Sequence, residues 1–310
     1  MAWINQNQPN NDQSYNEDLD LSEDKMLDLM ARESQYQFDS KITTDSKIRA
    51  GSKSLSRKRK IVMQTWKNTE VPEKWAKSPE SISKHLPDWD YILMTDEDNR
   101  NFIAQHRPDF LPYYDAFPYP IQRADAIRYV WMAYTDPSKY DLVLYMDLDI
   151  ELQGTLDPLF KGKMDHYFVG SGNLGGYQTN SMMAGRPGAQ IWHDMIDEMK
   201  KPAPWWAFTK HFIVMASTGP IALSRVVARS TEVWGKLPGQ LLMPCSVCDD
   251  RCISDVALAT PLEGQSWCGW DSLALNMLLC NWKQIAIVLA VIVFIALLTL
   301  CLSMYRWIAQ

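Results

Sequence analysis

This 310-residue sequence has only five histidines, its six cysteines all lie late in the chain, and its 31 lysines and arginines are fewer than its 37 acidic residues. No cysteine precedes Cys245, and none of the five histidines has a partner at a spacing typical of a catalytic or metal-binding pair. The formal net charge is −6 at pH 7, which gives no reason to expect nucleic acid as a partner. Residues 1–22 contain no apolar run that could serve as a signal peptide, and the chain has no internal repeat.

The few cysteines leave two main interpretations open. Cys245, Cys248 and Cys252 are spaced closely enough to hold zinc or to join disulfides. A structural zinc site needs four ligands, and no second CxxC or histidine pair follows at a suitable spacing. We therefore favour disulfides formed in an oxidising lumen, with free thiols as an alternative. The sequence does not determine the pairing.

The N-terminal 60 residues differ from the rest of the chain. They are polar at first and then basic, ending in the run Arg57–Lys60. We expect this segment to be mostly disordered, with a short helix over 21–35 that begins at the capping-box spacing of Asp20 and Glu23. Nuclear import and binding to acidic lipid are alternatives for the basic run, which we interpret as a solvated linker.

Residues 61–280 have the composition and pattern of a folded domain. The whole chain is 46% apolar and 22% charged, which is ordinary for a globular protein with a sizeable core. Strand-like and helix-like segments alternate, and this predicts an α/β fold with a mostly parallel sheet covered by helices on both faces. The strands are expected at 61–66, 89–94, 142–146 and 167–170, and the helices at 75–85, 121–134, 187–200, 220–229 and from an N-cap at Thr95. Residues 108–120, rich in proline and aromatics, are expected to form a packed loop, 156–159 a turn and 170–176 a flexible loop.

The strand over 142–146 runs directly into two aspartates, Asp147 and Asp149. Open α/β sheets bind ligands at the carboxyl ends of their strands. Two carboxylates one residue apart can both reach one divalent cation there, with Leu148 turned back into the core. Mg²⁺ and Mn²⁺ held in this way keep open positions for substrate phosphates. The alternative is a solvated turn, because Asp-x-Asp also occurs by chance.

The helix before that strand carries Asp125 and Arg128, which share one face at a spacing of three residues. A carboxylate can accept hydrogen bonds from sugar hydroxyls, and a guanidinium pairs with phosphate through two parallel hydrogen bonds. A surface ion pair explains the same two residues equally well.

The chain closes with an apolar run over 285–302 that contains no charge. Eighteen such residues are close to the length that crosses a hydrocarbon core. Trp282 and Lys283 stand before the run, and Tyr305, Arg306 and Trp307 stand after it, which is typical of interface anchors. We predict a single transmembrane helix, whose orientation the flanking charges leave undecided.

Several of these segments occur in the order that characterises a known family. The chain resembles glycosyltransferase family 32, whose members share a sugar-binding region containing DXD, over roughly residues 61–272. The family includes fungal mannosyl inositol phosphorylceramide synthases and initiation-specific α-1,6-mannosyltransferases. The segments that carry the resemblance are Gln64–Trp66, Trp89, Thr95–Asp98, Pro118–Tyr129, Tyr145–Asp149, Asn180, Arg186–Gly188 and Thr218–Pro220.

The resemblance implies a GT-A-type fold, a nucleotide-sugar donor, a divalent metal (usually Mn²⁺, otherwise Mg²⁺) and retention of anomeric configuration. It implies that Asp147 and Asp149 bind the metal and the donor, and that Asp125 and Arg128 hold the transferred sugar and its phosphate. Trp66 would lie against the nucleotide, unless it is a core tryptophan. Asn180 would face the sugar, unless it is an ordinary turn residue. No catalytic base is assigned.

Two segments toward the C-terminus bear on the acceptor. Gly264–Asp271 resembles a segment of the ceramide-directed members, but Gln265 and Cys268 replace a serine and a histidine there, and the histidine usually just upstream is absent. If that histidine binds metal or phosphate, activity is reduced or lost. The apolar run Trp205–Phe208 could meet a lipid acceptor or the bilayer surface, or it could belong to the core.

The sequence therefore favours a membrane-anchored transferase that moves mannose from GDP-mannose to inositol phosphorylceramide in the Golgi or another endomembrane. An N-glycan mannosyltransferase and a UDP-sugar transferase are enzymatic alternatives. A catalytically silent relative that binds a partner enzyme, or a membrane-tethered adaptor, belongs to a different class. The expected partners are the nucleotide sugar, a glycolipid or glycan acceptor and the membrane, and a regulatory membrane subunit is an open prediction.

Overall fold

The computed structural model describes residues 59–160, 166–170, 178–232, 234–237, 239–249, 254–264 and 267–308. The predictions for residues 1–58, including the helix over 21–35 and the basic linker up to Lys58, lie outside these ranges, as do those for most of the 170–176 loop and for Gln265.

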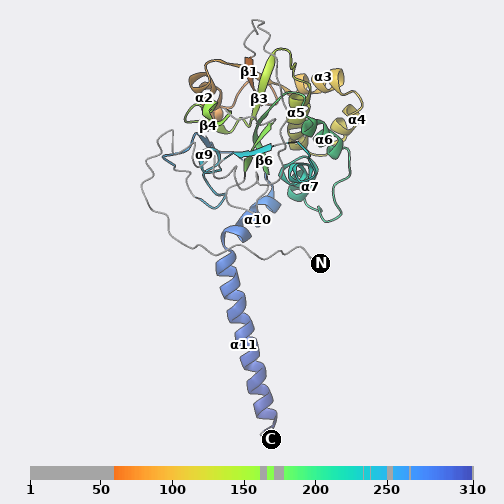
Figure 1. The fold of residues 1–310 in the computed structure, drawn as a ribbon. Coiled ribbons are helices and arrows are strands. Elements are labelled where there is room, and N and C mark those ends of the chain that lie inside the picture. Colours follow the sequence, from red (N-terminus) through yellow and green to blue (C-terminus); the bar gives the residue numbers. More distant parts are fainter. Residues whose placement is uncertain are drawn as a thin grey trace, which may run out of the picture. The chain divides into compact units, whose positions relative to one another are not determined.

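The centre of the fold is a six-stranded mixed sheet in the order β2-β1-β3-β6-β5-β7 (Figure 1). Its strands are β1 (Arg59–Thr65), β2 (Trp89–Met94), β3 (Tyr140–Met146), β5 (His166–Gly170), β6 (Gln178–Gly185) and β7 (Trp234–Leu237). Strand β1 pairs in parallel with β2 and β3, and β5 pairs in parallel with β7. Strand β6 is antiparallel to both of its neighbours, β3 and β5. The predicted α/β class with a mostly parallel sheet is confirmed.

Helices pack on one face of this sheet around the main hydrophobic core. They are α3 (Asp96–His106), α4 (Leu111–Ala116), α5 (Pro120–Tyr134), α6 (Gln190–Met199) and α8 (Pro220–Val227). Alternate strand residues face them, because successive side chains of a strand point to opposite faces: Ile61 and Met63 of β1, Val143 and Tyr145 of β3, and Met183 of β6. Helix α5 runs through this core, and ten of its fifteen residues are buried.

The other face of the sheet is covered near β3 by smaller elements. After η1 (Glu73–Trp75), helix α2 (Lys77–His85) packs against β4 (Ile150–Leu152), where the Leu152 amide donates to the Ser81 hydroxyl at 2.9 Å. Strand β4 pairs with β8 (Ala259–Pro261), which brings a segment from late in the chain beside the end of β3. The short elements η2 (Asp157–Phe160) and α9 (Gly239–Leu242) complete this region.

Most of the expected elements are present within a few residues of their predicted limits. Thr95 caps α3 with a full capping box, because its hydroxyl accepts from the Asp98 amide while the Asp98 side chain accepts from the Thr95 amide. The 108–120 loop is a wrong prediction, because α4 forms within it with Pro112 in its first turn, where a missing N–H costs nothing. Helix α6 begins at Gln190, three residues after Pro187, since Gly188 at φ 74° breaks the helix there. The 156–159 turn is the 3₁₀ helix η2.

Three further helices lie toward the C-terminal end of the chain. Helix α7 (Lys210–Ser217) lies beside α8, and α10 (Trp270–Cys280) contacts α7. After Asn281, α11 (Trp282–Ile308) contains the predicted apolar run and extends it at both ends. Among the described residues, α11 is the one helix that is long enough and apolar enough to cross a membrane. Its most apolar 18 residues have a mean hydropathy of 3.3, and none of them is buried by protein.

Candidate active site

A cavity of about 200 Å³ opens at the carboxyl ends of β1 and β3. The predicted site residues all line it, although they come from four separate parts of the chain: Trp66, Asp125, Arg128, Asp147, Asp149 and Asn180. Val214 and Met215 of α7 and Trp267 add an apolar wall to the cavity. The structure thus brings together every residue that the sequence predicted for the site.

Asp147 continues the line of β3 and is held from three directions. The Tyr145 hydroxyl donates to its Oδ1 at 2.6 Å, and the Arg128 guanidinium lies 3.3 Å from the same oxygen. Its backbone amide donates to the Ser181 carbonyl at 2.7 Å, and its carbonyl accepts from the Gln64 amide group at 3.2 Å. Tyr145 and Asp147 share one face of the strand because they are two residues apart.

Asp149 is fixed through its backbone and leaves its carboxylate available. Its backbone carbonyl accepts from the Leu262 amide at 2.7 Å. Within the described residues, no side chain donates a hydrogen bond to its carboxylate. Burial, and then the charge of Asp147, raise the pKa of Asp149 to about 7, and burial raises the pKa of Asp147 as well. Two neighbouring carboxylates repel each other when both are ionised, which raises their pKa values. A bound cation would relieve that repulsion.

The two aspartates fit a divalent metal that also binds a ligand. Within the described residues, no group of three or more His, Cys, Asp and Glu side chains gathers in a way that could hold a metal by itself. Mg²⁺ and Mn²⁺ prefer oxygen ligands and often bind through one or two carboxylates together with substrate phosphates. The donor set of Asp147 and Asp149 suits that kind of shared site rather than a closed structural one.

Arg128 and Asp125 form the floor of the cavity, not a surface ion pair. Both side chains are buried, and the Arg128 guanidinium lies 2.9 Å from Oδ1 of Asp125. Although burial opposes its charge, Asp147 holds the pKa of Arg128 above its ordinary value. The guanidinium also stacks 4.4 Å from the centre of the Tyr145 ring and donates to the Asn180 carbonyl. Arg128 is therefore a permanently charged group at the base of the site.

Asp125 accepts hydrogen bonds on both oxygens. The Asn180 side chain donates to Oδ1 at 3.1 Å, and the Thr218 hydroxyl donates to Oδ2 at 2.9 Å. Burial raises its pKa despite these donors and Arg128. Asn180 is a buried residue of β6, so the alternative of a turn asparagine is wrong. The network joins α5, β6 and the C-terminal end of α7 at the base of the cavity.

Trp66 lies at the rim, one residue beyond β1, and packs edge-on against Trp75 with 4.9 Å between the ring centroids. Its indole N–H is buried without a hydrogen-bond partner among the described residues. A buried donor costs free energy unless a partner satisfies it. An aromatic face with a free N–H at the mouth of a cavity suits a planar ligand with hydrogen-bond acceptors.

Sequence reasoning missed the residue that most closely confines Asp149. A Cβ placed on Gly264 would come within 2.0 Å of Oδ2 of Asp149, so the backbone passes directly beside the carboxylate. The segment is held there by the pairing of β8 with β4 and by the Trp75 indole, which donates to the Glu263 carbonyl at 2.6 Å. The sequence shows the segment that begins at Gly264, but its position beside Asp149 depends on the pairing of β8 with β4.

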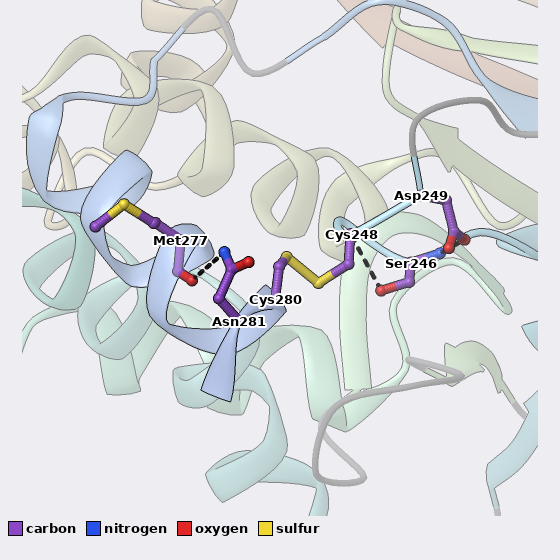
Figure 2. Close-up of a disulfide and its surroundings, with 6 residues drawn as sticks. All are labelled: Ser246, Cys248, Asp249, Met277, Cys280 and Asn281. Carbon is purple, nitrogen blue, oxygen red and sulfur yellow. Dashed lines mark hydrogen bonds between the residues drawn. A yellow bond between two sulfur atoms is a disulfide. The ribbon is translucent and has the colours of Figure 1, made fainter. Parts of the chain in front are cut away.

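The structure describes five of the six cysteines, and Cys252 lies outside the described residues. Cys248 and Cys280 form a disulfide across a separation of 32 residues (Figure 2). Cys268 and Cys301 are free thiols. Cys245 is also disulfide-bonded. Disulfide formation, favoured over zinc from the sequence, is therefore confirmed for Cys245 and Cys248.

Comparisons with known proteins match the part of the chain that carries Asp125, Arg128, Asp147 and Asp149. Residues 72–164 match the family described as glycosyltransferase sugar-binding region containing DXD motif. The chain is 40% identical over 184 residues to inositol phosphoceramide mannosyltransferase 3 of Schizosaccharomyces pombe, covering 58% of this chain and 46% of that protein. It is 34% identical over 222 residues to inositol phosphoceramide mannosyltransferase 2 of the same organism, covering 67% of this chain and 57% of that protein. The chain spans about half the length of these curated relatives.

Solved structures with a similar arrangement are glycosyltransferases of low sequence identity. Mouse xyloside xylosyltransferase 1 is 11% identical, with a TM-score of 0.44, over 67% of this chain and 98% of that one. A similarity at this level carries no argument about substrate. The sequence matches are the informative ones: over residues 72–164 this chain is similar to the glycosyltransferase sugar-binding region containing DXD motif, and it resembles the inositol phosphoceramide mannosyltransferases.

Proposed function

We propose that this chain is a metal-dependent, retaining glycosyltransferase that moves mannose from GDP-mannose to inositol phosphorylceramide. The observation that carries the proposal is the cavity in which Asp147 and Asp149 face the buried cation of Arg128. A sugar diphosphate is an anion that needs both a metal and a fixed positive charge. The names of the curated relatives supply the sugar and the acceptor for the proposal.

Each residue has a defined task in this proposal. Asp147 and Asp149 hold Mn²⁺ or Mg²⁺, which when bound supplies Lewis-acid stabilisation of the diphosphate leaving group. Arg128 donates hydrogen bonds to the phosphate attached to the transferred sugar. Asp125, already oriented by Asn180 and Thr218, has lone-pair capacity left to accept from a sugar hydroxyl. Trp66 covers the nucleotide, and its unpaired N–H gains an acceptor there.

The chain's location is part of the same proposal. Helix α11 anchors the protein as a single span in the Golgi or another endomembrane, with Trp282 and Trp307 near the two interfaces. The Cys248–Cys280 disulfide lies immediately before this helix and favours an oxidising lumen for the domain. A regulatory membrane subunit is an additional proposal that rests on the resemblance alone.

A donor assay tests the proposal. The purified full chain in nanodiscs is offered GDP-mannose and a panel of UDP-sugars, with Mn²⁺ and with a chelator, and release of nucleotide is measured. We expect Mn²⁺-dependent turnover of GDP-mannose, which Asp149→Ala abolishes and Asp141→Ala, an exposed change on the same strand, leaves intact. Turnover of a UDP-sugar without turnover of GDP-mannose would show that the donor is that UDP-sugar.

One observation favours a second candidate, a silent relative that binds a partner enzyme. Cys268 replaces a histidine of the ceramide-directed members, and burial raises the pKa of its thiol, which leaves it a poor ligand at neutral pH. A folded protein that neither binds nor turns over any donor would support this candidate and contradict the transferase.

A further inference from the structure

Two exposed apolar segments stand out near the cavity. Trp205 is 92% exposed and Phe208 is 80% exposed, on the loop that leads into α7. Trp270 is 78% exposed, and Leu273 and Met277 are more than half exposed, on α10. Aromatic and aliphatic side chains of this size are seldom left so open in a soluble protein unless something covers them. The alternative that Trp205 and Phe208 belong to the core is wrong.

The α10 residues form a single stripe. Trp270, Leu273 and Met277 follow one another at intervals of three and four, so they share one side of the helix. Ser272, on a different side, is buried and contacts the ring of His211 at 2.9 Å. Helix α10 therefore packs on the domain at Ser272 and leaves the side that carries Trp270, Leu273 and Met277 exposed.

The loop and the helix are held together at the N-terminus of α7. The His211 amide donates to Asp271 at 2.6 Å, the Lys210 amine donates to the Trp267 carbonyl, and the rings of His211 and Trp267 stack 5.5 Å apart. Phe208 lies two residues before Lys210, and Trp270 lies one residue before Asp271. The two apolar segments thus project from one junction.

The chain itself indicates what covers them. Only Asn281 separates α10 from α11, which contains the apolar run over 285–302. The Asn281 side chain donates to the Met277 carbonyl at 2.8 Å, as Figure 2 shows. The disulfide from Cys280 to Cys248 fixes this end of α10 to the domain. The apolar stripe therefore continues into a helix whose own surface needs lipid.

We infer that Trp205, Phe208, Trp270, Leu273 and Met277 form a bilayer-contacting surface that seats the domain on the membrane in which α11 is embedded. Tryptophan and phenylalanine are suited to the headgroup boundary, where the ring is covered by lipid and polar groups stay wet. The inference rests on the anchoring part of the proposed function but not on catalysis.

This surface is connected to residues that line the cavity. Trp267 stacks on His211 and also lines the cavity, as do Val214 and Met215 of α7. A domain seated through the α7–α10 junction therefore keeps the apolar wall of the cavity next to the lipid headgroups. The acceptor class that this arrangement favours is a lipid whose polar headgroup enters the cavity while its chains remain in the bilayer.

Photo-crosslinking tests the inference in the full chain reconstituted into nanodiscs. p-Benzoylphenylalanine replaces Phe208, Trp270, Phe294 or Tyr113 in four separate variants, and lipid adducts are detected by mass spectrometry after illumination. Phe294 lies within α11, and Tyr113 is an exposed residue of α4, which packs on α3 and α5. Each replacement keeps an aromatic ring at an exposed position, so folding is preserved.

We expect lipid adducts at Phe208 and Trp270 as well as at Phe294, and none at Tyr113. Adducts at Phe294 without adducts at Phe208 and Trp270 would overturn the surface while leaving the anchor in place. Protein–protein adducts at Phe208 in place of lipid adducts would assign the surface to a second copy or a subunit and overturn the inference. Absence of lipid adducts at Phe294 would contradict both the membrane anchor and the surface. Donor turnover is measured separately, so this result would leave the catalytic part of the proposed function standing.

Discussion

At the scale of single residues, the site depends on how closely Gly264 approaches Asp149. We predict that Gly264→Ala lowers Mn²⁺ affinity and turnover by about 10–100-fold, the usual effect of disturbing a neighbour of a metal ligand. The added methyl would displace the carboxylate, which is the free end of a side chain, so the cost in stability is small. Mn²⁺ titration and thermal unfolding of the same preparations measure the two effects.

Gly154→Ala is a matched control for that change. Its Cβ would come 2.9 Å from a methyl of Leu258, on the same β4–β8 region but away from the aspartates. We expect metal affinity close to that of the unmodified protein. An equal loss of Mn²⁺ affinity in both variants would show that the effect is a general disturbance of the region.

Much of the site could be predicted from residue order. Asp147 and Asp149 follow an apolar strand, and Asp125 and Arg128 share a helix face, so their chemistry is visible in the sequence. Burial of the Asp125–Arg128 pair and the position of Gly264 could not be predicted, because both depend on segments more than 50 residues away. Local patterns do not report tertiary contacts of this kind.

At the scale of elements, Glu198 of α6 forms ion pairs with α8 and with the segment that follows α8. Its buried carboxylate lies 3.0 Å from Arg225, 2.7 Å from Arg229 and 2.6 Å from Lys201. Although burial opposes ionisation, these partners lower its pKa from 4.5 to about 2. Because the pKa is lowered on folding, the stabilisation is present above the unfolded value and is lost as the pH falls toward 2.

We predict that Glu198→Gln lowers the free energy of unfolding by about 2–3 kcal/mol at pH 7, since one pKa unit corresponds to about 1.4 kcal/mol. Urea unfolding at a series of pH values measures the effect. The difference from the unmodified protein is expected to shrink between about pH 4.5 and pH 2. A difference that stays constant over that range would contradict the electrostatic account.

The elements that the sequence did not reveal share a physical cause. Strand β6 has the sequence Gln178–Gly185, without a continuous apolar run, and it becomes a strand because it pairs with β3 and β5. Helix α4 forms in a segment where prolines and aromatics obscure the helical pattern. Tertiary packing overrides local propensity in both cases.

At the scale of the whole molecule, the Cys248–Cys280 disulfide joins the domain to the base of α11. We predict that Cys248→Ser lowers the free energy of unfolding of the domain by about 3–4 kcal/mol, as expected for closure of a loop of this length. Urea unfolding, followed by intrinsic fluorescence in detergent, measures it. Cys268→Ser, which removes a free thiol, is the control and is expected to change stability far less. Equal stability of Cys248→Ser and the unmodified protein would contradict a structural role for the bond.

The proposed orientation follows from the same bond. In the proposed orientation the disulfide-bonded domain faces an oxidising lumen, and Arg306 lies on the cytosolic side of the span. Protease treatment of sealed microsomes is expected to spare the domain and to remove an epitope fused after residue 310. Digestion of the domain in sealed vesicles would reverse the orientation.

The central claim is that Asp147, Asp149 and Arg128 bind a metal and a sugar diphosphate for transfer to a lipid headgroup. The most direct measurement is mass-spectrometric detection of mannosylated inositol phosphorylceramide, formed by the full chain in proteoliposomes that contain the lipid, GDP-mannose and Mn²⁺. We predict product with the unmodified protein and with Asp141→Ala, and a loss of at least about 1,000-fold with Asp149→Asn, the scale expected when transition-state charge loses its main stabiliser. Equal product formation by Asp149→Asn would contradict the account.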